Sequence, residues 1–411
     1  MHVRFFLVLL VWFFVVDQLP AQKIYPEGCY RFTNFHLIDA EERSIRSDLE
    51  LLVQNGKIKQ ISPAAELNVP DQCEILNLDG TYLLPGMIDV HTHLASLESA
   101  KIALEAGVTT VRSASVTAYQ DVVLGRMVVA GKLAGPDVIP AGVYVTPQLG
   151  ETALADERLA VMDSIDSEAE LREVVRINID RGAQVIKARG TERAGLPDTD
   201  PRKQTYSQSQ LRVIISEAEK HDIPVMVHAH GDEGARAAVL AGARSIEHGT
   251  FLSEETLALM KERNCFLVPT HITLWDLIEP GGDYDNPIIL MRGQYMIPKS
   301  EAAIQRALAL GVRLATGADN RYLPHSTSRV SMEVEHFVRL GMDPFEALKT
   351  TGQHAAELLN LSTVTGSIHE GMEADLVAVP DNPIATIKAL QDVVLVMSNG
   401  HLVLNRLPFG R

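Results

Sequence analysis

The stretch Leu84-Pro-Gly-Met-Ile-Asp-Val-His-Thr-His-Leu94 closes an apolar run with two histidines, His91 and His93, that are separated by a single residue. Side chains two residues apart point to the same face of a β-strand, so these two imidazoles can bind one metal ion together. Four further residues of metal-ligand type follow apolar stretches downstream: Lys187, His228, His248 and Asp319. The pattern predicts a metal site built from several strand ends.

Strand-like and helix-like stretches alternate through the middle of the chain. The helical pattern is clearest at 168–181, where apolar residues recur at three- and four-residue intervals. Eight strand-like segments are expected, at 86–90, 108–112, 138–145, 184–188, 225–229, 244–247, 266–269 and 312–316. This alternation predicts the α/β class and a (β/α)8 TIM-type barrel, whose active site lies at the C-terminal ends of the strands. All six residues fall at or just beyond such ends.

The two ends of the chain have a different pattern. Short apolar strands separated by polar and glycine turns occupy 30–84, and the pattern resumes at 374–404 around the hairpin-turn pair Asn399-Gly400. We therefore expect a small β-sandwich domain built from both chain ends. The expected organisation is a signal peptide at 1–21, sandwich strands at 22–84, the barrel at 85–363 and further sandwich strands at 364–411.

The first residues have the composition of a targeting segment. Arg4 precedes an unbroken apolar run from Phe5 to Val16, and Ala21 places a small residue before a cleavage point. The run is shorter than the ~20 residues that span a bilayer, which favours a cleaved signal over a membrane anchor. The protein is expected to be exported, periplasmic or secreted, and free of the membrane once the signal is removed.

Charge and cysteine content restrict the partners and the compartment. A formal net charge of −16 argues against nucleic acid as a partner, because nucleic acid favours basic patches. A small molecule is the expected partner, and a homo-oligomer is possible. Export would allow Cys29 and Cys73 to be oxidised into a bridge, whereas Cys265 has the apolar neighbours of a buried thiol.

The chemistry of the six residues points to hydrolysis. Imidazoles and carboxylates suit zinc-like ions, and a site with three or four such ligands leaves a position for a water whose pKa the metal lowers. Lys187 has two interpretations, an ion pair with a barrel carboxylate, or a neutral amine beside metal ions that adds carbon dioxide and becomes a bridging carbamate.

Four other residues are candidates for contacts with the substrate. His230 shares a strand face with His228, so it either points into the pocket or packs in the structure. Arg189, His271 and Arg321 lie near expected strand ends, where they can bind an anionic group of the substrate. Glu247 alternates with His248, which predicts that it faces the opposite way, in the barrel wall.

Six segments together resemble the amidohydrolase superfamily, and within it the imidazolonepropionase-related branch that includes Xaa-Pro dipeptidase-like enzymes. They are Leu-Leu-Pro-Gly-Met-Ile-Asp-Val-His-Thr-His at 83–93, Glu-Ala-Gly-Val-Thr-Thr-Val-Arg at 105–112, Arg-Gly-Ala-Gln-Val-Ile-Lys at 181–187, His-Ala-His-Gly at 228–231, Ser-Ile-Glu-His-Gly-Thr at 245–250 and Gly-Ser-Ile-His-Glu-Gly-Met-Glu-Ala-Asp-Leu-Val at 366–377.

The resemblance implies a site with two divalent metal ions, zinc being the expected metal. His91, His93 and Asp319 would hold one ion, His228 and His248 the other, and Lys187 as carbamate would bridge them. Asp319 would also act as the catalytic acid and base.

The implied reaction is hydrolysis of a C–N amide bond in a small substrate such as a dipeptide or an N-acyl amino acid. Relatives with dipeptidase activity tend to have a Gly-Gly-His loop after the third strand. This chain has Thr146-Pro-Gln-Leu-Gly-Glu151 instead, and this departure weakens the expectation of proline-dipeptide specificity. The alternatives are a mononuclear hydrolase of a cyclic amide, as in imidazolonepropionase, hydrolysis of a lactone or phosphoester, and a non-catalytic binding protein on the same barrel.

Overall fold

The structure is a computed structural model that describes residues 23–64, 66–162, 164–282, 284–326 and 328–407. The predicted signal peptide at 1–21 lies outside these residues. Within the described ranges, no helix combines the length and the apolar character that crossing a membrane requires.

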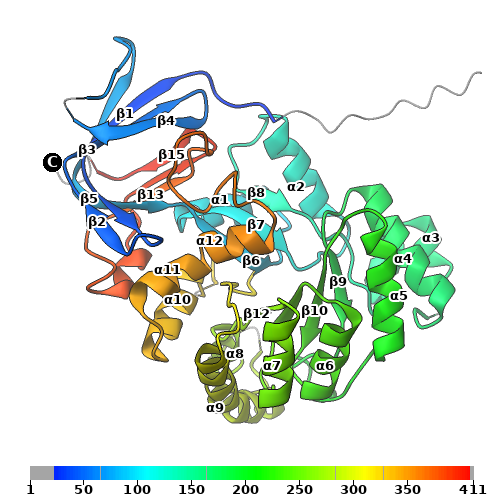
Figure 1. The fold of residues 1–411 in the computed structure, drawn as a ribbon. Coiled ribbons are helices and arrows are strands. Elements are labelled where there is room, and N and C mark those ends of the chain that lie inside the picture. The colour runs from blue at the N-terminus through cyan, green and yellow to red at the C-terminus, as the bar shows by residue number, and fades with distance from the viewer. Residues whose placement is uncertain (1–22, 65, 163, 283, 327, 408–411) are drawn as a thin grey trace, which may run out of the picture.

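The central strands form two parallel sheets, ordered β6-β7-β8 and β12-β11-β10-β9. Their bounds are β6 Met87–Thr92, β7 Val108–Ser113, β8 Asp137–Ile139, β9 Ile186–Arg189, β10 Val225–Ala229, β11 Ser245–His248 and β12 Phe266–Val268. Seven of the eight predicted strands are therefore regular strands close to their expected positions. In Figure 1 the strands of the second sheet lie inside a row of helices that includes α4 to α7.

Single bridges, rather than continuous ladders, connect the two sheets: Val145 with Ala188, Leu267 with Leu314 and Thr92 with Asn320. The predicted third strand ends early because Pro140 follows β8 and cannot donate to a ladder. The predicted eighth strand at 312–316 is not a regular strand, although it hydrogen-bonds on both sides. It occupies the eighth position of the barrel with a sparser pattern of pairing than the sequence predicts.

The helices follow the strands and cover their outer side. Helix α4 begins and ends as the sequence predicts, because Ser167 and Glu170 form a capping box at its start and Gly182 adopts a φ of 110° at its end. The helices are α1 Leu97–Glu105, α2 Gln120–Val129, α3 Glu157–Ala160, α4 Glu168–Arg181, α5 Gln208–Glu219, α6 Asp232–Ala241, α7 Glu254–Glu262, α8 Thr273–Asp276, α9 Pro287–Leu310, α10 Val330–Arg339, α11 Pro344–Thr350 and α12 Gln353–Leu358, with 3-10 turns η1 Gly150–Ala155 and η2 Ile387–Gln391.

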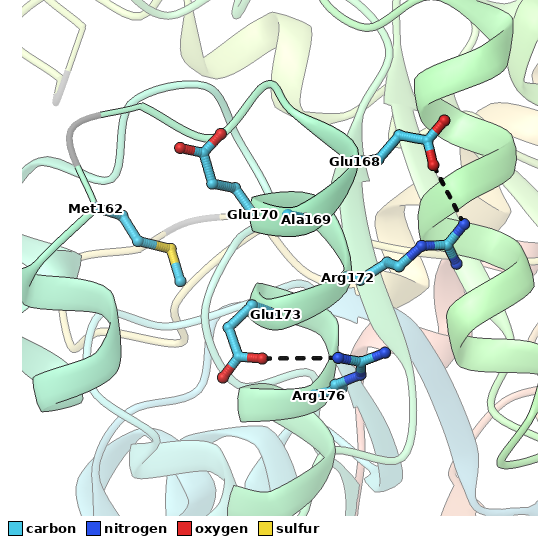
Figure 2. A pocket seen from close by; sticks show the side chains of 7 residues that line it. All are labelled: Met162, Glu168, Ala169, Glu170, Arg172, Glu173 and Arg176. Carbon is cyan, nitrogen blue, oxygen red and sulfur yellow. Dashed lines mark ion pairs between the residues drawn. The ribbon is translucent and has the colours of Figure 1, made fainter.

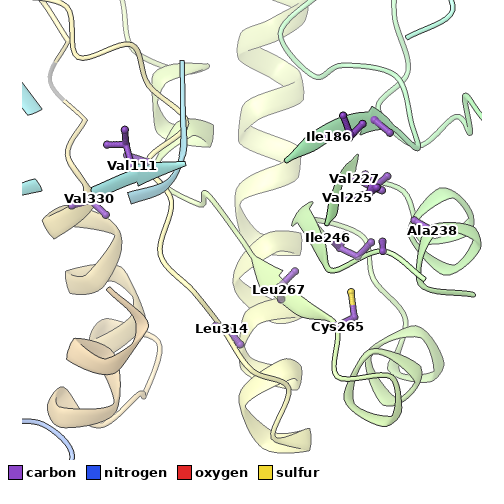
Figure 3. Packing of buried hydrophobic residues seen from close by; sticks show 14 of the residues in the cluster. Val111, Ile186, Val225, Val227, Ala238, Ile246, Cys265, Leu267, Leu314 and Val330 are labelled. Atoms are coloured by element: carbon purple, nitrogen blue, oxygen red, sulfur yellow. The ribbon is translucent and has the colours of Figure 1, made fainter. Parts of the chain in front are cut away.

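Alternation along the strands decides which side chains point inward. In β10, Val225 and Val227 belong to the large core that also contains Ala238 of α6, and Figure 3 shows them on the side of this helix. Met226 instead packs with Val185 in a separate interior cluster. By the two-residue period, His228 shares the inner face with Met226, and Lys187 shares it with Val185.

Both chain ends join one separate β-rich sheet, as the sequence predicts. The sheet has the order β15-β14-β13-β5-β1-β3-β4, with β2 paired to β1, and it has its own apolar core. Its blue and red segments lie side by side in Figure 1. The bounds are β1 Cys29–Asp39, β2 Ser44–Arg46, β3 Leu49–Gln54, β4 Lys57–Pro63, β5 Glu74–Pro85, β13 Leu376–Val379, β14 Leu395–Ser398 and β15 His401–Asn405.

Strand β5 joins the two ends of the chain, because it pairs with β1 on one side and with β13 on the other. The strands expected within 30–84 are at 35–38, 49–53 and 57–61 and do not include β5, which leads directly into β6 and so connects the terminal sheet to the barrel. Cys29 at the start of β1 forms a disulfide with Cys73 just before β5, and Cys265 is a free, buried cysteine.

Candidate metal centre

The six residues predicted as ligands lie together where the barrel strands end. Two groups of potential ligand atoms, each with mutual separations within 4.8 Å, form there, and the groups are His91, His93 and Asp319, and His228, His230 and His248. The ring centroids of His91 and His248 are 5.1 Å apart, so the two groups adjoin.

In the first group, the Asp319 carboxylate faces two imidazoles. Its Oδ1 atom is 3.1 Å from His93 Nε2 and 3.4 Å from His91 Nε2. His93 Nδ1 donates to the Ser115 carbonyl at 2.6 Å, which leaves the Nε2 lone pair of His93 available to a metal. Asp319 has a φ of 48°, a left-handed conformation that turns its carboxylate toward these rings.

His91 is held by a buried chain of polar side chains. Its Nδ1 atom lies 2.6 Å from Glu247 Oε2, and the other Glu247 oxygen accepts a hydrogen bond from Arg112 Nη2 at 2.9 Å. Arg112 also donates to the Val90 carbonyl and to the Ser245 hydroxyl. This arrangement fixes the proton of His91 on Nδ1 and directs Nε2 toward Asp319, as carboxylates do for metal-binding histidines.

In the second group, the tautomers of two histidines follow from their partners. Thr270 donates its hydroxyl proton to the Pro269 carbonyl, so it accepts from His248 Nδ1 at 2.7 Å, which leaves Nε2 of His248 free. His228 Nε2 donates to the Glu192 carbonyl at 3.2 Å, so its lone pair is on Nδ1. Each of these rings offers one nitrogen to a metal.

His230 lies in the second group rather than at its edge. Its ring stacks on that of His248 with centroids 4.5 Å apart, and its Nδ1 atom is 2.9 Å from the Thr250 hydroxyl. From the sequence, His230 is expected to be a substrate contact or a packing residue. The geometry adds a third nitrogen ligand to those alternatives.

Lys187 adjoins the first group from β9. Its Nζ atom is 3.2 Å from His91 Nε2 and 5.6 Å from the centre of the Tyr144 ring, and its side chain is buried. Burial lowers the pKa of Lys187 to about 8, so a larger fraction of this amine is neutral than of an exposed lysine.

Burial lowers the pKa of His91, His228, His230 and His248 and so favours their neutral form, the form that binds metal. It lowers the pKa of His91 to about 4 and that of His230 to about 3. Burial alone would raise the pKa of Asp319, but the neighbouring His91, His93 and Lys187 outweigh it and hold this pKa below its ordinary value. The site therefore combines an anionic carboxylate with neutral nitrogen donors, and this donor set fits divalent ions such as zinc.

Residues 82–403 match the amidohydrolase family. The chain belongs to this family. The amidohydrolase is 27% identical to ochratoxinase from Aspergillus niger over 353 residues, which are 75% of this chain and 72% of the relative. It is 23% identical to imidazolonepropionase from Kosmotoga olearia over 399 residues, 88% of this chain and 92% of that one.

Comparison with solved structures supports the same family assignment. A Xaa-Pro dipeptidase with methionine bound in its active site superposes with a TM-score of 0.80 at 25% identity, over 91% of this chain and 99% of the other. The A. niger ochratoxinase structure superposes with a TM-score of 0.78 at 25% identity, over 93% and 97%. The amidohydrolase is thus a metal-dependent hydrolase that acts on carbon–nitrogen bonds.

The substrate contacts predicted at His271 and Arg321 stay predictions, and the two side chains lie in different surroundings. The His271 side chain packs away from the ligand groups, since it is fully buried with Nδ1 3.0 Å from the Ser300 hydroxyl of α9 and its ring 5.1 Å from that of His336 in α10. The preceding Thr270, which has a φ of 45°, is the residue that reaches His248. Arg321 is exposed.

Glu247 and Arg112 are the residues of the site that sequence reasoning missed or placed wrongly. Strict alternation of side chains along β11 would direct Glu247 away from His248, into the barrel wall. His248 has a φ of 75°, so the two-residue alternation fails at this strand end. The side chains of Glu247 and His248 therefore both reach His91. A signal existed, because Arg112 and Glu247 are charged residues inside otherwise apolar strands, and such residues require partners.

A groove of about 680 Å³ lies elsewhere, along α4 and beside Met162 (Figure 2). Its walls include the pairs Arg172–Glu168 and Arg176–Glu173, which are ordinary ion pairs along one turn of a surface helix. None of the predicted ligands lines this groove.

Proposed function

We propose that this amidohydrolase uses a binuclear metal site to hydrolyse the amide bond of a small dipeptide or N-acyl amino acid. This proposal depends on one observation: the two groups of potential ligands adjoin each other. Lys187 Nζ lies 3.2 Å from His91 Nε2 in the first group. His91, His93 and Asp319 would hold one ion, and His228 and His248 the other. When bound, such ions supply hydroxide near neutral pH and polarise a carbonyl.

Lys187 is assigned the bridge between the ions. Its buried amine is more readily deprotonated than an exposed one, and a neutral amine can attack carbon dioxide. The new N–C bond turns the amine into a carbamate with release of one proton. The product carries a negative charge and two oxygens, which suit two cations better than an ammonium group does.

Asp319 is assigned the proton transfer. Its Oδ1 atom faces His93, while its Oδ2 atom lies 4.0 Å from His248 Nδ1, so the carboxylate reaches toward both groups. From this position it takes a proton from the attacking water and returns it to the leaving amine. Glu247 and Arg112 hold His91 and do not touch the substrate.

The proposed function is tested by metal analysis and substrate hydrolysis on one sample. Zinc-loaded protein is assayed against dipeptides, N-acyl amino acids, cyclic amides and lactones, while bound metal per chain is measured. Two ions per chain with hydrolysis of linear amides is the expected result. One ion per active chain with hydrolysis of a cyclic amide would support the mononuclear alternative, and fully loaded protein that cleaves no amide would refute the proposal.

We also propose that the protein is exported. The disulfide between Cys29 and Cys73 supports this, because disulfides persist in oxidising compartments. The signal-like pattern of 1–21 is the second support. Sequencing the N-terminus of protein recovered from the periplasm or culture medium tests it, and the expected mature chain begins just after Ala21.

A further inference from the structure

The loop between β9 and α5, residues 190–206, supplies hydrogen-bond partners to the second group of potential ligands. Its Glu192 carbonyl accepts the proton of His228 Nε2 over 3.2 Å. Its Thr191 hydroxyl accepts the main-chain N–H of His230 over 3.0 Å. The partners that orient the two histidines of the first group come instead from β11 and from the segment after β7. The position of the β9–α5 loop therefore bears on one ligand group and not on the other.

This loop also packs tightly against the main chain that follows β10. A Cβ atom added to Gly231, the residue after His230, would lie 2.3 Å from the Arg202 carbonyl oxygen. A Cβ atom added to Gly234 would lie 2.5 Å from the Gly190 carbonyl oxygen. Both arms of the loop therefore contact the turn that carries His230, so a shift of the loop changes the support of that turn.

The tip of the loop, residues 193–202, contains no helix or strand, and α9 holds it through a single arginine side chain. The Arg292 guanidinium donates to four main-chain carbonyls of the tip, which are those of Ala194, Leu196, Pro197 and Thr199. A guanidinium can do this because its five N–H donors point outward in a fixed planar fork, whereas a lysine ammonium presents its donors from one point. The conformation of the tip therefore depends on Arg292.

Other surface arginines of the barrel make a simpler contact with the main chain. Arg126 donates to the carbonyl of Arg181 at the end of α4, and Arg212 donates to that of Leu240 in the last turn of α6. These are the usual contacts of a basic side chain with the free carbonyls of a helix end. Arg292 differs from them because it connects α9 to a loop whose arms contact potential metal ligands.

We propose that Arg292 is a positioning residue for the second metal ion. By fixing the tip of the β9–α5 loop, it keeps the Glu192 carbonyl on His228 and the Thr191 hydroxyl on the main chain of His230. Without the guanidinium, four carbonyls at one place lose their donor and the tip rearranges. The second ligand group then loses its preset geometry, and the first keeps its own. This inference rests on the proposed function for the second ion and names a residue on which the affinity for that ion depends.

Hydrogen–deuterium exchange tests the link between Arg292 and the second group, on zinc-loaded protein and again after zinc is removed. The main-chain N–H of His230 reports it directly, because the loop supplies its acceptor. Arg292→Met should exchange at least about 10-fold faster at His230 and across 193–202, with no change at 91–93. Arg212→Met is the matched control and should exchange at these positions as the wild type does. Unchanged exchange at His230 in Arg292→Met overturns the proposal.

Zinc titration against a competing chelator tests the consequence for the metal. Arg292→Met should bind one ion with the affinity of the wild type and the other about 10- to 100-fold more weakly, the usual effect of losing an outer partner of a metal-binding histidine. Arg292→Lys should recover only part of this affinity, because one ammonium cannot reach four carbonyls. Wild-type affinity for both ions in Arg292→Met, or an equal loss for both, overturns the proposal.

A variant of the loop itself shows the direction of the effect. Thr191→Val removes the acceptor of the His230 N–H and leaves the contacts of Arg292 in place. It should speed exchange at His230 and weaken the second ion, while the tip exchanges at its wild-type rate.

The two proposals fail in different ways. A wild-type protein that binds one ion contradicts the binuclear function, and exchange at His230 still decides the role of Arg292. Two ions and amide hydrolysis, together with unchanged exchange at His230 in Arg292→Met, would keep the proposed function and remove Arg292 from it.

Discussion

The Glu247 carboxylate accepts a hydrogen bond from His91 Nδ1 over 2.6 Å, and both side chains are fully buried. Arg112 holds the second oxygen of Glu247, so the orientation of His91, a proposed metal ligand, depends on a pair of charges from two other strands. Burial would raise the pKa of Glu247, but Arg112 and His91 outweigh this and lower it to about 2. The carboxylate is therefore ionised at neutral pH.

Glu247→Gln should lower the affinity of the protein for its metal by about 10- to 100-fold, the usual effect of losing an outer partner of a metal-binding histidine. Chelator competition against zinc measures this. Glu50→Gln is the control, because Glu50 is a buried carboxylate paired with Arg31 in the terminal sheet. Equal metal affinity of the two variants would show that Glu247 stabilises the fold without positioning His91.

Lys187→Ala should abolish most activity and lower the metal content, because no anion then bridges the two ligand groups. Carbon-13 nuclear magnetic resonance of wild-type protein equilibrated with labelled bicarbonate should show a carbamate carbon that is absent from the variant. Turnover of Lys187→Ala at the wild-type rate would rule out the bridged site. Lys203→Ala is a suitable control, since Lys203 is exposed and pairs with Glu192.

The stability of the folded chain should depend on pH through Glu333. Burial raises the pKa of Glu333 from 4.5 to about 8, while its two oxygens accept the main-chain N–H groups of His271 and Ile272. The folded state then keeps a proton that the unfolded state releases above pH ~4.5, so stability is highest below that pH and declines as pH rises toward 8. The steepest slope is about 1.4 kcal/mol per pH unit.

Glu333→Gln should flatten this decline, as seen in urea unfolding of metal-loaded protein between pH 5.5 and 8.5. The variant also loses one main-chain hydrogen bond, which offsets its stability from that of the wild type, so only the slope is diagnostic. Parallel curves for variant and wild type would mean that Glu333 does not hold the proton.

Removing the disulfide with Cys29→Ser and Cys73→Ser should lower the free energy of unfolding by about 2–4 kcal/mol, because the bridge closes a loop with a sequence separation of 44 residues. Denaturant unfolding of both single variants and the double variant measures the loss. Cys265→Ser is the contrasting case, since it places a hydroxyl in a buried apolar position without opening a loop. An unchanged midpoint in the double variant would show that the bridge does not constrain the unfolded chain.

Much of the fold and of the candidate site could be predicted from local patterns. Helix α4 has its observed bounds in the sequence because the capping residues Ser167 and Gly182 are local signals. The six ligand-type residues were found because apolar runs mark the strands, and ligands follow where those runs stop. Strand β5 was missed because its residues alternate with polar and glycine positions over 74–85.

The sequence by itself determined the order of strands and helices, the inward face of each regular strand and the placement of ligand-type side chains at the strand ends, because these follow from short-range periodicity. Only the tertiary structure decided that Glu247 reaches His91, that His271 turns away and that Arg189 lies on Tyr144. The physical reason is that positive φ angles at His248, Thr270 and Asp319 break the alternation at the strand ends. Beyond that point the direction of a side chain depends on partners from other strands, which no local pattern contains.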